Sequence, residues 1–196
     1  MSKLLASFAL IATLMGLSGC GMQALPRSSN EVDASWSEVV NQYKRRADLI
    51  PNLVQVVKQY ASHEKETLEG VVSARARATQ TVINPGDLNE ANLKKFQAAQ
   101  GELSSALSRL MVVSERYPDL KANENFRDLQ VQLEGTENRV TIARQRYIET
   151  VKKYNNLVTV PPVSWFNAML WHYEKKPQFT VENQKAIENA PQVSFR

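Results

Sequence analysis

Two histidines, one cysteine and twenty acidic residues are the side chains from which this sequence could build a reactive site. His63 and Glu64 are adjacent and have the residue types of a zinc site. A helical zinc-protease motif needs a second histidine four residues after the first, but that position is Thr67. The other histidine, His172, lies in an aromatic C-terminal stretch, and the paired Glu-x-x-His motifs of di-iron bundles do not occur. The sequence therefore predicts no catalytic metal site and no cofactor.

Four charged residues fall on apolar stripes with helical spacing, namely Glu64, Arg75, Glu137 and Arg144. A buried charge without a partner costs several kcal/mol, so we expect these side chains to pair between the first and the last long helix. We interpret them as a structural polar layer that fixes the register of the helices. The alternative is an acid–base site in which Glu64 and Glu137 would serve an envelope hydrolase or accessory enzyme.

Cys20 is the clearest chemical signal and the only cysteine of the chain. It follows a lysine and an apolar run, residues 4–17, that is shorter than the roughly 20 residues of a membrane span but suits a signal-peptide core. The run ends in "LSGC", which resembles the bacterial lipobox, where the cysteine sulfur receives diacylglycerol and the chain is cut before it. We expect a lipoprotein signal peptide at residues 1–19 and a covalent lipid such as palmitate on Cys20. The alternatives are an ordinary secretory signal and a signal anchor.

A lipidated Cys20 would keep the protein on its membrane, because more than one acyl chain anchors stably. We expect a place in the bacterial cell envelope, on the periplasmic face. Gly21 stands where an aspartate would direct enteric lipoproteins to the inner membrane, which favours the outer membrane. The net charge of +4 is too mild to indicate nucleic-acid binding. The expected partners are therefore the membrane and an unidentified protein, with no small-molecule substrate.

The apolar pattern predicts long helices after a flexible start. Residues 20–31 contain Gly, Pro and Ser without an apolar period, and we expect a tether there. From Val32 to Arg75 apolar residues recur in steps of three and four, which predicts one long helix. Similar stripes at residues 96–117 and 126–158 predict two more, separated by turn signals and prolines.

Several residues predict where these helices begin and end. Asp87 and Glu90 have the spacing of a capping box for the second helix. Asn123 is a candidate N-cap for the third, Pro118 ends the second, and Pro161-Pro162 end the third.

Pro51 interrupts the first stripe within "YKRRADLIPNLV". A proline inside a helix removes one hydrogen bond and crowds the carbonyl four residues earlier, here that of Ala47. We expect the helix to be kinked or broken at Pro51. A continuous helix would place the C-terminal tail far from the lipid, whereas a full turn at Pro51 would create a fourth helix and bring the tail closer. Lys44, Arg45 and Asp48 lie beside the stripe and are interpreted as a solvated flank.

The predicted fold is all-α: an elongated, antiparallel, up-and-down helical bundle of three long helices and a short one, similar to a four-helix bundle. It occupies residues 32–196 as one domain. The C-terminal "VSWFNAMLWHY" is rich in large apolar side chains and offers a candidate contact with a partner or a membrane. The alternative is that this segment caps the open end of the bundle. The candidate contact residues are Trp165, Phe166, Met169 and Trp171.

Several long motifs give the chain a resemblance to the LemA family. They are "KRRADLIPNLV" followed by "HE", "RYPDLKANENFRDLQ" at 116–130, "EGTENRVTIARQRY" at 134–147 and "VKKYN" at 151–155. The resemblance implies a membrane-anchored four-helix bundle with no established enzymatic activity, and roles centred on membrane-associated organisation. It thus favours a non-enzymatic scaffold or envelope assembly factor. Many members carry an N-terminal transmembrane helix, and this chain departs from them in having a lipobox.

Overall fold

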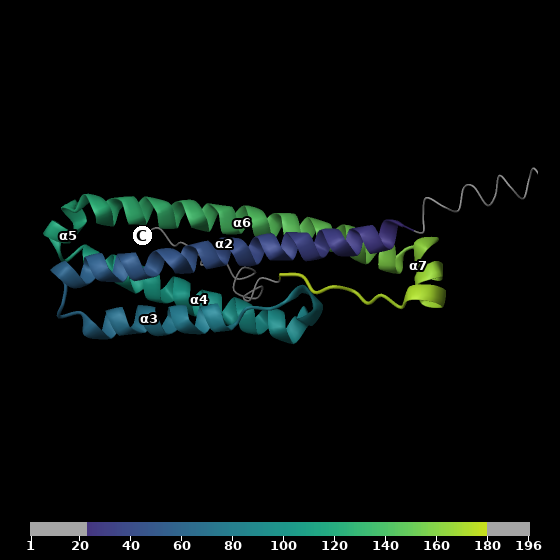
Figure 1. Cartoon of the computed structure of the whole chain (residues 1–196), viewed down its shortest axis with the longest axis horizontal. Helices are drawn as coiled ribbons and strands as arrows, with labels where there is room; N and C mark the ends of the chain where they lie inside the picture. The colour runs from purple at the N-terminus through teal and green to yellow at the C-terminus, as the bar shows by residue number, and fades with distance from the viewer. Residues whose placement is uncertain (1–22, 180–196) are drawn as a thin grey trace, which may run out of the picture.

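The computed structural model describes residues 23–179, and within them the chain is helical with no strand. Figure 1 shows long helices that run alternately in opposite directions. They are α2 (Ala24–Tyr60), α3 (Lys65–Gln80), α4 (Glu90–Ser114) and α6 (Glu124–Thr159). The short elements are η1 (Pro85–Asp87), α5 (Pro118–Ala122), α7 (Val163–Phe166) and the π-helical turn η2 (Asn167–Trp171). The predicted all-α antiparallel bundle is confirmed.

The bundle has two unequal parts. Helices α2 and α6, of 37 and 36 residues, pack along each other, while the shorter α3 and α4 pair with each other and complete the bundle around the second half of α2. Each of the two long helices is about 55 Å long at 1.5 Å per residue. At the end where α2 begins, the two long helices are covered by α7, η2 and an extended segment instead (Figure 1).

Two apolar cores follow from this arrangement. In the four-helix part, leucine and alanine side chains such as Leu53, Leu103 and Leu110 are buried together. In the other part the core is aromatic: Trp36 makes edge contacts with Phe96 and Tyr147, at centroid distances of 5.3 and 5.4 Å. Edge-to-face contacts of this kind stabilise beyond the area they bury.

The start of α2 corrects the prediction of a tether at residues 20–31. The helix begins at Ala24, and Leu25 and Ser28 are already buried. Pro26 suggested a loop, but it lies in the first turn, where a backbone N–H has no partner inside the helix and its absence costs nothing. Cys20 and the signal-peptide prediction lie outside the described residues.

Pro51 neither breaks nor reverses the first helix. It lies inside α2, which continues to Tyr60, and the reversal falls at residues 61–64 instead. The first stripe is therefore two antiparallel helices, α2 and α3, and the prediction of a break at Pro51 was wrong in position. Because this adds a fourth long helix, α6 ends beside the beginning of α2, as Figure 1 shows.

The helix caps were predicted in part. Asn123 caps α6 by accepting a hydrogen bond from the N–H of Phe126, as expected. At α4 the cap is Asn89, which accepts from Asn92, and Asp87 lies in η1 instead of in a capping box. Within residues 23–179 no helix is both long and apolar enough to cross a membrane.

Candidate functional site

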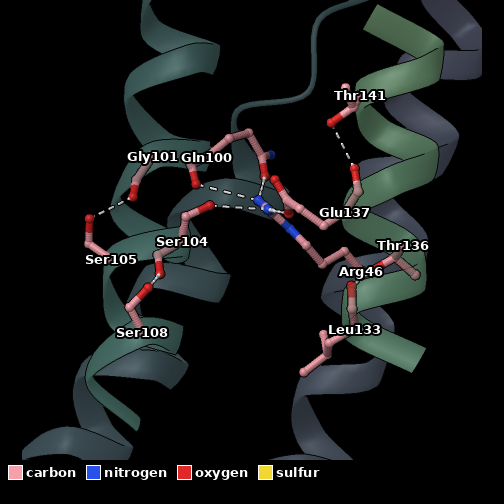
Figure 2. Close-up of polar contacts among 10 residues, drawn as sticks. All are labelled: Arg46, Gln100, Gly101, Ser104, Ser105, Ser108, Leu133, Thr136, Glu137 and Thr141. Carbon is pink, nitrogen blue, oxygen red and sulfur yellow. Dashed lines mark hydrogen bonds and ion pairs between the residues drawn. The ribbon is translucent and has the colours of Figure 1, made fainter. Parts of the chain in front are cut away.

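The buried polar centre of the bundle is Arg46, whose side chain is only 3% exposed. Its Nη1 donates to Glu137 at 2.7 Å and to Ser104 at 3.1 Å, and its Nη2 donates to the side-chain oxygen of Gln100 at 3.0 Å (Figure 2). Gln100 in turn donates to the carbonyl of Ala78. One arginine of α2 thus links α4 and α6 directly, and reaches α3 through Gln100.

Sequence reasoning missed this arginine. Arg46 belongs to the basic cluster that precedes Pro51 and stands three positions after Tyr43. Its guanidinium lies over the Tyr43 ring, 5.1 Å from the centroid. The apolar face of a globular helix is wider than a two-position stripe, and position 46 falls within that width. The spacing of three from Tyr43 was the signal that could have found it.

The predicted polar layer does not form. Glu64, Arg75, Glu137 and Arg144 lie at different levels, and no contact joins any two of them among the described hydrogen bonds and ion pairs. None of the four is buried, and the side chain of Glu137 is 57% exposed. The expected link between the first and last long helices does exist, but Arg46 supplies the cation.

Arg75 compensates for the backbone hydrogen bond that Pro51 removes from α2. Its Nε donates to the carbonyl oxygen of Ala47 at 2.8 Å. That carbonyl stands four residues before Pro51 and would accept the N–H that proline lacks. A side chain from α3 therefore replaces the missing backbone hydrogen bond of α2.

Glu64 lies at the turn between α2 and α3, where it accepts hydrogen bonds from Arg116 and from the hydroxyl of Tyr117, each at 3.1 Å. The hydrogen bond to Glu64 raises the pKa of Tyr117, because the carboxylate favours the protonated phenol. His63 lies exposed in the same turn. These contacts tie the α2–α3 turn to the end of α4.

Arg144 lies next to Phe179, with its guanidinium 4.6 Å from the ring centroid. Phe179 ends an extended segment, residues 172–179, which we call the strap. The hydroxyls of Tyr147 and Tyr154 donate to strap carbonyls at 2.8 and 2.9 Å. Asn155 both donates to and accepts from the backbone of Lys176. These three side chains of α6 therefore hold the strap along the helix. From the sequence, they were predicted only as members of an apolar stripe or of a family motif.

Burial raises the pKa of three tyrosines, Tyr43, Tyr147 and Tyr154. Removal from water raises the pKa of Tyr154 to about 12 and that of Tyr147 higher still. Burial also raises the pKa of Tyr43, against the opposing effect of Arg144 and Arg46. All three phenols therefore remain neutral at physiological pH, and those of Tyr147 and Tyr154 act as hydrogen-bond donors to the strap.

The candidate contact residues at the C-terminal end separate into two kinds. Trp165 and Met169 are 68% and 77% exposed, and Phe166 and Leu170 are also exposed. Trp171 is only partly exposed and packs against the aromatic core. The segment therefore covers the end of the bundle on one side and presents large apolar side chains on the other.

The carboxylates were also candidates for catalysis. A groove of about 340 Å³ lies beside Glu137 and is lined by Ser104, Ser108 and Glu134 among others. Its wall contains no histidine, and the Oε2 of Glu137 is held by Arg46. Glu64 lies at the α2–α3 turn and, among the contacts of residues 23–179, shares no partner with Glu137. No group of three or more His, Cys, Asp or Glu residues within 23–179 is placed to bind a metal ion.

Comparison of the sequence with known proteins gives distant relatives and a family. Magnetosome protein MamQ 2 and MamQ 1 of Paramagnetospirillum magneticum (strain AMB-1) are each 24% identical over 151 residues. MamQ of Magnetospirillum gryphiswaldense (strain MSR-1) is 24% identical over 153 residues. These alignments cover 68–69% of this chain and 56% of each relative, so the chain spans about half the length of the curated relatives it matches. The LemA family model matches residues 35–195, and the chain therefore belongs to the LemA family.

Proposed function

We propose that this protein is a lipid-anchored, non-enzymatic scaffold or assembly factor of the bacterial cell envelope. The observation that carries the proposal is how the polar groups of the bundle are used. Arg46 and Arg75 are bonded to other helices of the same chain, and Glu64 is bonded to the turn that follows α4. Side chains committed to internal contacts stabilise one shape, and a fixed shape is what a scaffold requires.

The anchor is the second part of the proposal. The sequence before α2 places the lipobox cysteine four residues before Ala24, so a lipid on Cys20 would hold the bundle directly at the membrane surface. LemA membership supports a membrane-associated role, and the three relatives are named as magnetosome proteins. Since the chain matches only about half of their length, a partner is proposed here only as an unidentified envelope protein.

Metabolic labelling tests the anchor. Bacteria expressing the full chain are grown with an alkyne-tagged palmitate analogue, and the purified protein is assayed for the tag and by mass spectrometry of its N-terminus. We expect labelling of the wild type and of the control Met22→Ala, which keeps the lipobox, and no labelling of Cys20→Ser. Equal labelling of Cys20→Ser and wild type would refute the anchor.

The groove beside Glu137 is the observation that favours the alternative, an envelope hydrolase. Glu137→Gln distinguishes the two roles because it keeps the shape of the side chain and removes its charge. A scaffold loses stability when Arg46 is left buried without a carboxylate, by about 1–3 kcal/mol given that Glu137 is half-exposed. An unchanged denaturation midpoint, together with loss of a hydrolytic activity that the wild type possesses, would favour the enzyme.

A further inference from the structure

Four large apolar side chains project from one end of the bundle. They belong to α7 and η2, within six consecutive residues, and we call them the aromatic tip. Its members are Trp165, Phe166, Met169 and Leu170. Large apolar side chains that are exposed together, instead of singly, mark an interaction surface.

The tip is held in place by contacts on its inner side. Asn167 is buried, donates to the carbonyl of Tyr173 and accepts from the N–H of the same residue, both at 2.9 Å. Val163 and Trp171 pack against the aromatic core. The exposure of the tip is therefore imposed by a fixed backbone and is not the result of a loosely held terminus.

The tip lies at the end of the bundle where α2 begins, as Figure 1 shows. Leu25 belongs to the same core cluster against which Val163 and Trp171 pack, so the first turn of α2 and the tip segment share one core. Cys20 precedes Ala24 by four residues, a span of at most about 14 Å when fully extended. A lipid on Cys20 would therefore bring this end, and no other, against the headgroups of a bilayer.

The charges around this end suit an anionic leaflet. A groove of about 570 Å³ between the start of α2 and the end of α6 is lined by Arg27, Lys153, Glu31 and the apolar Leu157. Two cations beside one carboxylate leave a net positive wall. Cations attract lipid phosphates, while aromatic and aliphatic side chains settle at the headgroup level of a membrane.

We propose that the aromatic tip inserts into the interface of the leaflet that holds the Cys20 lipid, with the Arg27 and Lys153 groove facing the headgroups. The bundle then has two points of attachment, one covalent and one made by side chains, and stands in a fixed orientation on the membrane. This inference rests on the proposed lipid anchor. A second copy of the chain or a protein partner covering the tip is the competing outcome.

Tryptophan quenching tests the insertion. The full lipidated chain is reconstituted into vesicles of phosphatidylglycerol and phosphatidylcholine, with or without brominated phosphatidylcholine, and its fluorescence is also measured against aqueous iodide. Trp36, which is fully buried, and Trp171, which is partly exposed, are present in both proteins, so the difference between wild type and Trp165→Phe reports Trp165 alone. We expect bromolipids to quench the Trp165 signal at least two-fold and iodide to have little effect on it.

A matched control places an indole elsewhere. Val112, on α4, is 68% exposed, the same fraction as Trp165. The signal of the added indole, taken as the difference between Trp165→Phe/Val112→Trp and Trp165→Phe, should show the reverse behaviour, with quenching by iodide and none by bromolipid. Loss of the bromolipid effect when phosphatidylglycerol is omitted would further support the role of the basic groove.

Two results would overturn the inference. Iodide quenching of Trp165 equal to that of the Val112→Trp control would mean that the tip faces water. Protection from both iodide and bromolipid would mean that a protein surface, such as a second copy, covers the tip. Mass spectrometry of the same sample separates the two proposals: an acylated Cys20 with a water-exposed Trp165 refutes only the insertion, whereas an unmodified Cys20 refutes the anchor itself.

Discussion

The contact between Arg75 and the carbonyl of Ala47 makes a sharp prediction, because it exists on account of Pro51. Replacing Arg75 with methionine keeps most of the apolar stem and removes the donor. The carbonyl then has neither a backbone N–H nor a guanidinium as partner. In Pro51→Ala, by contrast, the restored N–H of residue 51 can donate to the same carbonyl, and the guanidinium becomes redundant.

The magnitude follows from the geometry. A hydrogen bond from a charged donor contributes about 1.5–3 kcal/mol. Arg75 is partly exposed, so water can replace part of the lost contact, and we expect Arg75→Met to cost about 1–2 kcal/mol. In the Pro51→Ala background the cost should fall below about 0.5 kcal/mol, leaving a coupling energy of about 1 kcal/mol between the two sites.

Urea denaturation of the four proteins of this cycle measures the coupling, and thermal melts should show a loss of about 2–8 °C for Arg75→Met alone. Arg77→Met is the matched control, since Arg77 lies on the same helix and forms an ion pair with Glu102 in which both side chains are more than half-exposed. Its cost should be below about 1 kcal/mol and independent of Pro51. Equal costs of Arg75→Met in the wild-type and Pro51→Ala backgrounds would refute the reasoning.

Three further expectations concern the aromatic core and the strap. Burial raises the pKa of Tyr154 to about 12 from an ordinary 10. The stability that the neutral phenol contributes should therefore be complete below pH 10 and lost as the pH rises to 12. Tyr154→Phe should flatten the pH dependence of the denaturation midpoint between pH 10 and 12. Asn155→Ala removes two hydrogen bonds to the strap, and amide exchange of residues 172–179 should accelerate at least ten-fold while exchange in α4 stays unchanged. Trp36→Phe deletes the indole N–H that donates to the carbonyl of Ile83 at 2.9 Å, and should lower the free energy of unfolding by about 2–3 kcal/mol in urea titrations.

The helical content and the antiparallel order could be predicted from the sequence because the apolar period is local information. Asn123 was predicted as a cap for the same reason. The turn at residues 61–64 could not be located, since "ASHE" contains neither glycine nor proline and the stripe continues across it. The break was predicted at Pro51 because the sequence does not show that Arg75 replaces the hydrogen bond that this proline removes. The contact between Arg75 and Ala47 joins residues 28 positions apart in the chain.

The polar contacts were harder to predict than the helices. Spacing along a helix shows which face a charge occupies, but the partner depends on the levels at which different helices meet. Glu137 was assigned to the interface between the first and last long helices, and its partner turned out to be Arg46 instead of one of the charges on the apolar stripe. The contacts of the strap could not be predicted, because they use backbone groups of an extended segment, which leave no periodic signal.

The strap and the paired long helices would respond differently to mechanical load. A pull along the axis of α2, applied at its first residue, would strain the α2–α6 interface in shear, so that many buried contacts resist together. A pull that lifts the strap from α6 would open its hydrogen bonds one after another, from Tyr154 toward Tyr147 or in reverse. The bundle would thus be stiff toward forces that arrive through its first helix and compliant toward forces that arrive through its last described segment.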